Sequence, residues 1–289
     1  MRKIAVINQK GGSGKTTTVV NAGSAIAEMG QKVLLIDLDP QAHTTIHLGF
    51  EPFKLEKSVY DVLINDTAFD EVLLETQTKN LFLLPAKIEL ASAEIELVNT
   101  IGREIILRES LKKSKNDFDY IFIDCPPSLG LLTLNALTTA AEVIIPIQAE
   151  FFALEGLTKL VQTIQLVTER INPATHISGV LITMFDKRKN ICKEVAERVK
   201  KHFGDRVFKT KIRENVKLAE APSFGQTIFE FAPNSHGAED YRKLAKEIIM
   251  GGEHEKKRTR ERPSKLDHIH SVRETKEKGK SRSKGHSKI

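Results

Sequence analysis

The chain has 289 residues and a hydrophobic content of 40%, which is enough for one large α/β domain with a sizeable core. Two cysteines, Cys125 and Cys192, are too few for a disulfide framework or a cysteine-ligated metal, and they suit a reducing cytosol. No apolar run approaches the ~20 residues of a membrane span, and the amino terminus enters a strand directly, without a signal peptide. These features predict a soluble, cytoplasmic protein.

The net charge of +6 is concentrated at the carboxyl end of the chain. Residues 251–289 contain 13 Lys and Arg but 6 Asp and Glu, a net charge of +7, which leaves −1 for residues 1–250. A low apolar content with many Lys, Arg, Ser, Gly and His residues is typical of disorder. We therefore expect one domain over residues 1–250 and a basic, disordered tail over residues 251–289, which either is simply solvated or adds a contact to nucleic acid.

The first predicted elements surround a glycine turn. Residues 4–7 predict a buried strand and residues 18–27 have helical spacing, and between them stands Lys10-Gly11-Gly12-Ser13-Gly14-Lys15-Thr16-Thr17. A strand, a glycine turn and a helix N-terminus in this order form an anion cradle, because backbone N–H groups and the helix dipole point at the anion. We expect Lys15 to reach the β- and γ-phosphates of a nucleotide and the Thr16 hydroxyl to ligate Mg²⁺.

Strands and helices alternate through the rest of residues 1–250. Further strands are expected at residues 32–39, 80–85, 118–124, 142–147 and 180–183. Helices are expected at residues 58–65, 90–113 (with a break near 100–102), 131–141, 153–171, 191–202 and 236–249, with a short helical turn at 214–220. This alternation predicts an α/β fold: a mostly parallel sheet with helices on both faces, in the Rossmann-like three-layer architecture of P-loop NTPases.

Three acids stand at the ends of two predicted strands. Ligands bind at the carboxyl ends of parallel strands, so Asp37, Asp39 and Asp124 should lie beside the glycine turn. Asp124 is expected to bind Mg²⁺ through a water, although an isolated acid at this place would equally suit a helix cap or a turn. Asp39 is the candidate for orienting the attacking water, whereas Asp37 serves either the structure or the hydration of Mg²⁺.

A second lysine, Lys10, precedes the paired glycines, and Gln9 stands where an ordinary P-loop has Gly. Gly11 and Gly12 lack side chains, so another backbone can approach the loop closely. This placement suggests that Lys10 reaches the nucleotide of a second subunit, with ATP at a two-fold interface. The alternative is a solvated lysine at the mouth of the loop.

Residues 10–17 resemble the deviant Walker A motif of the ParA/MinD group of P-loop ATPases. Asp37-Leu38-Asp39-Pro40-Gln41 resembles the second motif of that group, and Ile123-Asp124-Cys125-Pro126-Pro127 its Walker B region. Segments typical of the chromosomal ParA (Soj-like) branch are similar to residues 179–186, 215–223 and 231–238. The similarity covers about residues 1–250.

The resemblance implies an ATPase that uses ATP and Mg²⁺, forms a homodimer around two ATP molecules and then binds double-stranded DNA without sequence preference. A ParB-like centromere-binding protein would stimulate hydrolysis and release the dimer, and the protein would be associated with the nucleoid. Lys10 would act on the nucleotide of the other subunit, with Lys15 and Asp39 as further catalytic residues. Arg188 and Lys217 would contact DNA.

The expected nucleotide-binding set is Lys10, Gly11, Gly12, Ser13, Gly14, Lys15, Thr16 and Thr17, with Thr16 and Asp124 at the metal. Phe185, Ile212 and Asn215 are expected around the adenine, where apolar side chains could instead belong to the core. Other basic residues could extend the DNA-binding patch: Lys187, Lys189 and Arg213.

Two other classes of protein remain as alternatives. A membrane-associated positioning ATPase resembling MinD would need a C-terminal amphipathic helix. Here Leu266, Ile269 and Val272 are scattered among charges, so no stable membrane association is expected. A metabolic P-loop enzyme, either a small-molecule ligase or an iron–sulfur reductase, is the other alternative. Two separated cysteines cannot hold a four-cysteine cluster within one chain.

Overall fold

The computed structural model describes residues 1–150 and 157–260, with side chains as far as Gly251. The chain divides into two units, Met1–Glu247 and Ile248–Ile289, and the fold below is that of the first unit. Within the described residues, no helix has the length and apolar character that a bilayer crossing requires.

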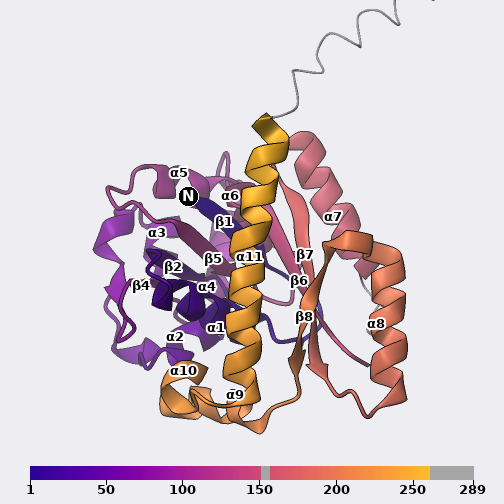
Figure 1. Cartoon of the computed structure of the whole chain (residues 1–289). Coiled ribbons are helices and arrows are strands. Elements are labelled where there is room, and N and C mark those ends of the chain that lie inside the picture. Colours follow the sequence, from indigo (N-terminus) through magenta and orange to yellow (C-terminus); the bar gives the residue numbers. More distant parts are fainter. Residues whose placement is uncertain (151–156, 261–289) are drawn as a thin grey trace, which may run out of the picture. The chain divides into compact units, whose positions relative to one another are not determined.

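A single sheet forms the centre of the first unit (Figure 1). Its eight strands, counted over the described residues, have the order β3-β4-β2-β5-β1-β6-β7-β8. Their bounds are β1 Arg2–Val6, β2 Val33–Asp37, β3 Leu74–Glu75, β4 Leu81–Leu84, β5 Tyr120–Asp124, β6 Glu142–Gln148, β7 His176–Phe185 and β8 Val207–Arg213. Neighbouring strands are parallel except for β3 and β4, which are antiparallel. The predicted α/β fold with a mostly parallel sheet is confirmed.

Helices connect the strands and cover both faces of the sheet. Their bounds are α1 Lys15–Glu28, α2 His43–His47, α3 Val59–Ile64, α4 Leu90–Glu96, α5 Ile106–Lys112, α6 Leu131–Thr139, α7 Leu157–Arg170, α8 Asn190–Phe203, α9 Val216–Glu220, α10 Ile228–Phe231 and α11 His236–Arg260. Short 3-10 turns occupy Pro52–Lys54, Phe69–Glu71, Leu97–Asn99, Gly204–Arg206 and Ala221–Phe224.

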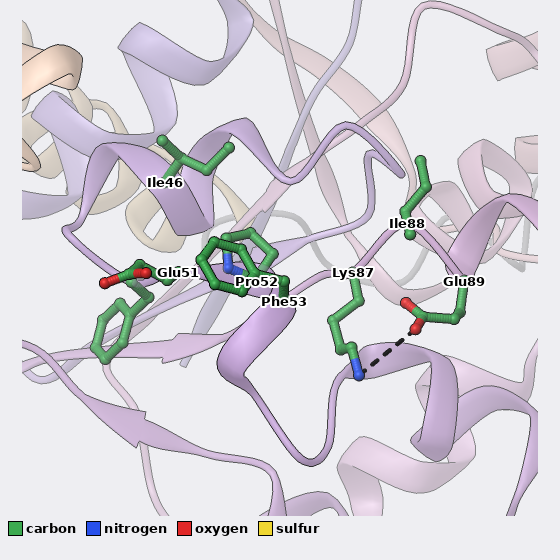
Figure 2. A pocket seen from close by; sticks show the side chains of 8 residues that line it. Ile46, Glu51, Pro52, Phe53, Lys87, Ile88 and Glu89 are labelled. Atoms are coloured by element: carbon green, nitrogen blue, oxygen red, sulfur yellow. Dashed lines mark ion pairs between the residues drawn. The ribbon is translucent and has the colours of Figure 1, made fainter.

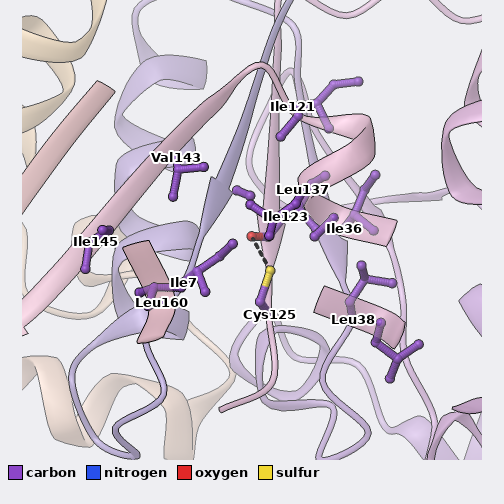
Figure 3. Close-up of a cluster of buried hydrophobic side chains, with 14 of the residues drawn as sticks. Ile7, Ile36, Leu38, Ile121, Ile123, Cys125, Leu137, Val143, Ile145 and Leu160 are labelled. Carbon is purple, nitrogen blue, oxygen red and sulfur yellow. Dashed lines mark hydrogen bonds between the residues drawn. The ribbon is translucent and has the colours of Figure 1, made fainter. Parts of the chain in front are cut away.

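The largest part of the core lies between the sheet and the layer that contains α6 and α7. Figure 3 shows Ile36 of β2, Ile123 of β5 and Val143 of β6 together with Leu137 of α6 and Leu160 of α7. These side chains are almost completely buried. Because alternate residues of a strand point to opposite faces, such runs of apolar residues are needed where helices cover both sides of a parallel sheet.

The opposite face of the sheet is covered by α1. A Cβ added to Gly23 would stand 2.6 Å from Cδ2 of Leu35, so the missing side chain lets α1 lie close against β2. The hydroxyl oxygens of Thr18 on α1 and Tyr241 on α11 are 3.3 Å apart. This contact joins α1 to the part of α11 that belongs to the same unit, and α1 in turn carries the glycine loop at its N-terminus.

Some predicted elements differ from the structure. The sequence did not indicate β8, whose alternation of charged and apolar residues suits an edge strand with one exposed side. The break predicted near residues 100–102 is confirmed, since α4 and α5 are separate helices and Gly102 has a φ of 74°. Prediction ended the last helix at residue 249, but α11 continues to Arg260.

Other predictions fall outside the described residues. The start of the helix predicted for residues 153–171 is one of them, since α7 is described from Leu157. Disorder was predicted for residues 251–289, but residues 251–260 continue helix α11, and residues 261–289 lie outside the described residues. The division of the chain at residues 250 and 251 stays a prediction.

Candidate nucleotide and magnesium site

Glycines shape the loop between β1 and α1. Gly12 and Gly14 have φ values of 71° and 89°, a left-handed conformation that glycine adopts without steric cost. A Cβ placed on Gly11 or Gly12 would meet no atom within 4 Å, so the space in front of the loop is open. Helix α1 begins at Lys15 without a side-chain cap, which leaves its first N–H groups for another partner. The loop therefore has the geometry of an anion cradle.

Two side chains hold this loop to the sheet. The Asn8 amide donates to the carbonyl of Pro146 at 2.6 Å, and the Thr183 hydroxyl donates to the carbonyl of Ser13 at 2.9 Å. Among the described atoms, the Ser13 hydroxyl is buried without a hydrogen-bond partner. Since buried polar groups are nearly always bonded, Ser13 fits a place beside a bound ligand. The side chain of Lys15 lies at the base of the loop, where the residue is 8% exposed.

Asp124 ends β5 beside the first turn of α1. The Thr16 hydroxyl donates to its Oδ2 at 2.7 Å, whereas Oδ1 is buried and has no partner among the described atoms. Burial raises the pKa of Asp124 to about 6, although hydrogen bonds from Thr16 and Thr44 and the charge of Lys15 lower it. Oxygen ligands from a hydroxyl and a carboxylate are those that Mg²⁺ prefers, so Thr16 and Asp124 fit this ion.

Asp37 is fully buried and is bonded entirely within the protein. Its Oδ2 accepts from the N–H and the hydroxyl of Thr45, at 2.9 and 2.8 Å, and its Oδ1 accepts from the N–H of Asp39 at 3.2 Å. Burial, followed by the charge of nearby Asp124, raises the pKa of Asp37 to about 8. These bonds favour a structural role for Asp37. The carboxylate of Asp39 accepts from the N–H of Gln41 at 3.0 Å, and this residue remains 8% exposed.

A pocket of about 310 Å³ opens beside the glycine loop. Its lining consists of Gly14, Thr17, Thr183, Met184, Ile212, Arg213, Glu214, Asn215, Val216, Leu218, Ala219 and Tyr241. Ligand pockets combine apolar walls with a few polar groups, so this one fits an adenine next to the phosphate cradle. The structure thus brings Ile212 and Asn215 to the loop. Sequence reasoning missed Leu218 and Tyr241: Leu218 lies in the family-like segment 215–223 but was given no role, Tyr241 lies outside every motif, and both line the pocket only in the folded chain.

Phe185, the third residue expected near the adenine, does not line this pocket. Its ring lies 4.3 Å from Nζ of Lys211, and it lines a neighbouring pocket with Lys187 and Arg188. Phe185 directly follows Met184, which does line the first pocket and has a φ of 52°. Successive residues at the end of a strand point to opposite sides, and this separates the two side chains.

Lys10 lies at the mouth of the loop. Its N–H donates to Oδ1 of Asn8 at 3.0 Å, and its ammonium group forms an ion pair with Glu150. The Lys10 side chain is 36% exposed and that of Glu150 is 40% exposed. The side chain of Asn8 therefore holds the backbone of Lys10, while the charged end of Lys10 remains near solvent.

The residues expected to bind DNA all form ion pairs at the surface. Arg188 pairs with Asp186 at 2.8 Å, and its guanidinium holds the pKa of that carboxyl well below its usual range. Lys217 pairs with Glu220, also at 2.8 Å. Two residues of the wider set are also paired, Lys189 with Glu214 and Arg213 with Asp240. Within the described part of the chain, Lys187 is the one member of the set without an ion pair.

A second, apolar pocket of about 580 Å³ contains none of the expected site residues. It is lined by Ile46, Phe50, Glu51, Pro52, Phe53, Lys87, Ile88 and Glu89, and Lys87 pairs with Glu89 at 3.6 Å (Figure 2). Ile46 belongs to α2, the helix that also carries Thr44 and Thr45. Helix α2 therefore separates this pocket from the aspartates of the site.

Comparisons with known proteins place the chain in a family. A family model described as an AAA domain matches residues 1–177. The sporulation initiation inhibitor protein Soj of Bacillus subtilis is 51% identical over 249 residues, which cover 86% of this chain and 98% of that protein. The chromosome partitioning protein ParA of Myxococcus xanthus is 44% identical over 248 residues, 86% of this chain and 88% of that protein. The chain belongs to the Soj/ParA family of partitioning ATPases.

Solved structures of similar fold agree with this assignment, and two of them contain a nucleotide and magnesium. A protein of Mycobacterium smegmatis described as cobyrinic acid a,c-diamide synthase, with bound ATP analogue and magnesium, has a TM-score of 0.76 and 40% identity, covering 86% of this chain and 94% of that one. The septum site-determining protein MinD of Pyrococcus horikoshii with Mg-ADP has a TM-score of 0.70 and 26% identity, covering 86% and 95%. The predicted ATPase activity and the predicted cofactors, ATP and Mg²⁺, are confirmed for this Soj/ParA-family chain.

Proposed function

We propose that this Soj/ParA-family ATPase is an ATP-gated switch for DNA partitioning. Two copies close around two ATP molecules, the dimer binds double-stranded DNA without sequence preference, and hydrolysis stimulated by a ParB-like protein releases it. The protein then acts in the cytoplasm, on the nucleoid. The observation that supports this most directly is Lys10, which stands half-exposed beside an open glycine turn.

Lys10 is suited to act on the nucleotide of a second copy. Lys15 already lies buried at the base of its own loop, so the phosphates of the same subunit have their lysine. The ion pair of Lys10 with Glu150 is partly exposed, and such pairs stabilise a protein by about 0–1 kcal/mol. Lys10 can therefore exchange Glu150 for a γ-phosphate at little cost. Because Gly11 and Gly12 leave open space, a second backbone can come close enough.

Phosphoryl transfer depends mainly on positioning and on neutralising charge. Mg²⁺, when bound, would supply positive charge that offsets the charge of the phosphates. In this chain Thr16 would hold the ion directly and Asp124 through a water. The N–H groups of the loop and Lys15 would bind the phosphates, and Asp39 would orient the attacking water. Asp37 keeps the backbone of Asp39 in place through the hydrogen bond to its N–H.

DNA binding would use the basic surface near the end of β7. The side chain of Arg188 is 84% exposed, and its bidentate bond to Asp186 has the geometry with which arginine binds a planar anion. A DNA phosphate would replace Asp186 or Glu220 at Arg188 or Lys217. Because all of these basic residues except Lys187 form ion pairs in the single chain, the net local charge is small, and dimerisation would be needed to double it. The net charge of +7 in residues 251–289 could add to this attraction.

Sedimentation tests this proposal. We expect the wild-type chain to be a dimer with ATP and Mg²⁺, a monomer with ADP, and to bind arbitrary duplex DNA in the ATP state alone. Lys10→Ala should bind ATP but stay monomeric. The control is Lys112→Ala, which removes a more exposed lysine from another surface ion pair. A wild-type chain that stays monomeric at saturating ATP and Mg²⁺, or a Lys10→Ala variant that dimerises normally, would refute the proposal.

The same experiment separates the alternatives. The likeness to a structure described as a cobyrinic acid a,c-diamide synthase favours a small-molecule ligase as a second candidate. Such an enzyme would use the nucleotide site without any response to DNA. A MinD-like membrane-associated ATPase would instead co-sediment with lipid vesicles in the presence of ATP; the segment containing Leu266, Ile269 and Val272, on which that alternative depends, lies outside the described residues.

A further inference from the structure

Thr44 is a buried hydroxyl at the site that no sequence motif identified. It lies on α2 and is 0% exposed. Its Oγ1 donates to Oδ2 of Asp124 at 2.8 Å, so this single oxygen accepts both from Thr44 and from Thr16, the latter at 2.7 Å. Asp124 is therefore held by two helices, α1 and α2, that follow different strands.

Two hydroxyl donors limit what Asp124 can do. A carboxylate oxygen has two lone-pair sites, and both sites of Oδ2 are occupied by Thr16 and Thr44. The carboxylate cannot rotate without breaking these bonds. Its Oδ1 is left buried and without a partner among the described atoms. Oδ1 consequently has one fixed position, from which it could accept a hydrogen bond from a water on the metal.

Thr44 also connects the two acids that the proposed reaction uses. Helix α2 follows Asp39 after a tight turn, in which the N–H of Ala42 donates to the carbonyl of Asp39 at 2.8 Å. Ala42 has a φ of 54°, a conformation that costs a non-glycine residue on the order of 1 kcal/mol or more and persists only where the surroundings hold it. The bonds of Thr44 to Asp124 and of Thr45 to Asp37 hold this turn.

We infer that Thr44 is a positioning residue for Mg²⁺: its hydroxyl orients Asp124 toward the ion and ties the metal carboxylate to the segment of Asp39. This inference rests on the metal role proposed for Asp124 and Thr16. Groups that orient metal ligands from behind typically change metal affinity by 10–100-fold when they are removed. The binding of the nucleotide base does not depend on Thr44, because the pocket beside Ile212 does not include it.

The test compares Thr44→Val, which keeps the shape but removes the hydroxyl, with Thr44→Ser, which keeps the hydroxyl. The measurement is the Mg²⁺ concentration that gives half-maximal binding of a fluorescent, non-hydrolysable ATP analogue. We expect this concentration to rise about tenfold in Thr44→Val and to change less than twofold in Thr44→Ser. Affinity for the analogue in EDTA should not change. The matched control is Thr175→Val, another buried threonine, whose hydroxyl bonds Leu137 and Ala140.

An unchanged Mg²⁺ requirement in Thr44→Val, or an equal rise in Thr44→Ser, would overturn the inference. Thr44→Ala, which introduces no new methyl group against Asp124, replaces Thr44→Val if the latter does not fold, with the same expected rise. Asp124→Asn separates this inference from the proposed function. If Asp124→Asn raises the Mg²⁺ requirement and Thr44→Val does not, Thr44 has no positioning role; if neither does, the metal role of Asp124 itself is wrong.

Discussion

Two regions at the carboxyl ends of the strands differ in the burial and in the bonding partners of their charged groups. Around β1, β2 and β5, the aspartates are buried, and hydroxyls and backbone N–H groups bond them, as at Asp37 and Asp124. Around β7 and β8, the charges lie at the surface and pair with one another, as Arg188 does with Asp186. We call these regions the carboxylate centre (Thr16, Asp37, Asp39, Thr44, Asp124) and the basic margin (Lys187, Arg188, Lys189, Arg213, Lys217).

The difference is physical. A buried polar network is rigid, because any movement leaves an unbonded group in a low dielectric. A surface ion pair is stabilised by less than about 1 kcal/mol and exchanges easily. The carboxylate centre is thus suited to hold an ion and a phosphate chain in one geometry. The basic margin is suited to exchange its own carboxylates for those of another molecule, or for phosphates.

Removing the lysine at the base of the loop should produce the largest effect. We expect Lys15→Ala to weaken ATP binding by at least about 100-fold, since a buried cation that meets the phosphates contributes several kcal/mol. Isothermal titration with ATP and Mg²⁺ measures this. Thermal unfolding without nucleotide is the control for folding, because the ammonium group of Lys15 donates no hydrogen bond among the described residues, although its charge acts on buried Asp124. Normal ATP affinity in Lys15→Ala would show that the glycine loop is not the phosphate site.

A smaller effect is expected in the pocket that Ile212 lines, between the glycine loop and the basic margin. Ile212 is 3% exposed, and the loss of its contacts with the adenine should weaken ATP binding about tenfold in Ile212→Ala. Phe185→Ala is the matched control and should leave affinity unchanged, since Phe185 does not line this pocket. The measurement is the affinity of each variant for ATP, compared with its affinity for GTP in a competition assay. A larger loss in Phe185→Ala than in Ile212→Ala would move the adenine to the neighbouring pocket.

The basic margin should show the smallest effect in a single substitution. We expect Arg188→Glu to weaken DNA binding several-fold at low salt and to reduce the salt dependence, with ATP-driven dimerisation intact. Arg206→Glu, in the 3-10 turn just before β8, is the control for a change of two charges elsewhere. Fluorescence anisotropy of labelled duplex DNA at two salt concentrations measures both. Loss of dimerisation in Arg188→Glu would assign the residue to the subunit interface instead.

The carboxylate centre was largely predictable from the sequence, and the basic margin was not. Lys15, Thr16 and Asp124 each follow directly after a strand or a turn that local residues specify. The strand ends lie together because neighbouring strands are parallel, and the pairing of β2 with β5 sets Asp37 opposite Asp124. By contrast, the ion pair of Arg213 with Asp240 joins residues 27 positions apart on elements with no common motif. No local pattern reports which carboxylate a surface arginine will meet.

Thr44 shows the same limit inside the carboxylate centre. Its helix, α2, has five residues and was not predicted, because it lacks a side-chain cap and begins from the unusual conformation of Ala42. The bond between Thr44 and Asp124 spans 80 positions in the sequence. It exists because β2 and β5 are neighbours in the sheet.

The sequence by itself determined the α/β alternation, the glycine loop and the acids at the ends of the strands, because each depends on residues within one or two turns of the chain. The family and the use of ATP and Mg²⁺ follow from those local features. Only the tertiary structure decided which residue of β7 faces the pocket beside the glycine loop, which basic side chains are already in ion pairs, and which hydroxyls bond Asp124. These contacts join distant segments, and packing of the whole sheet sets their geometry.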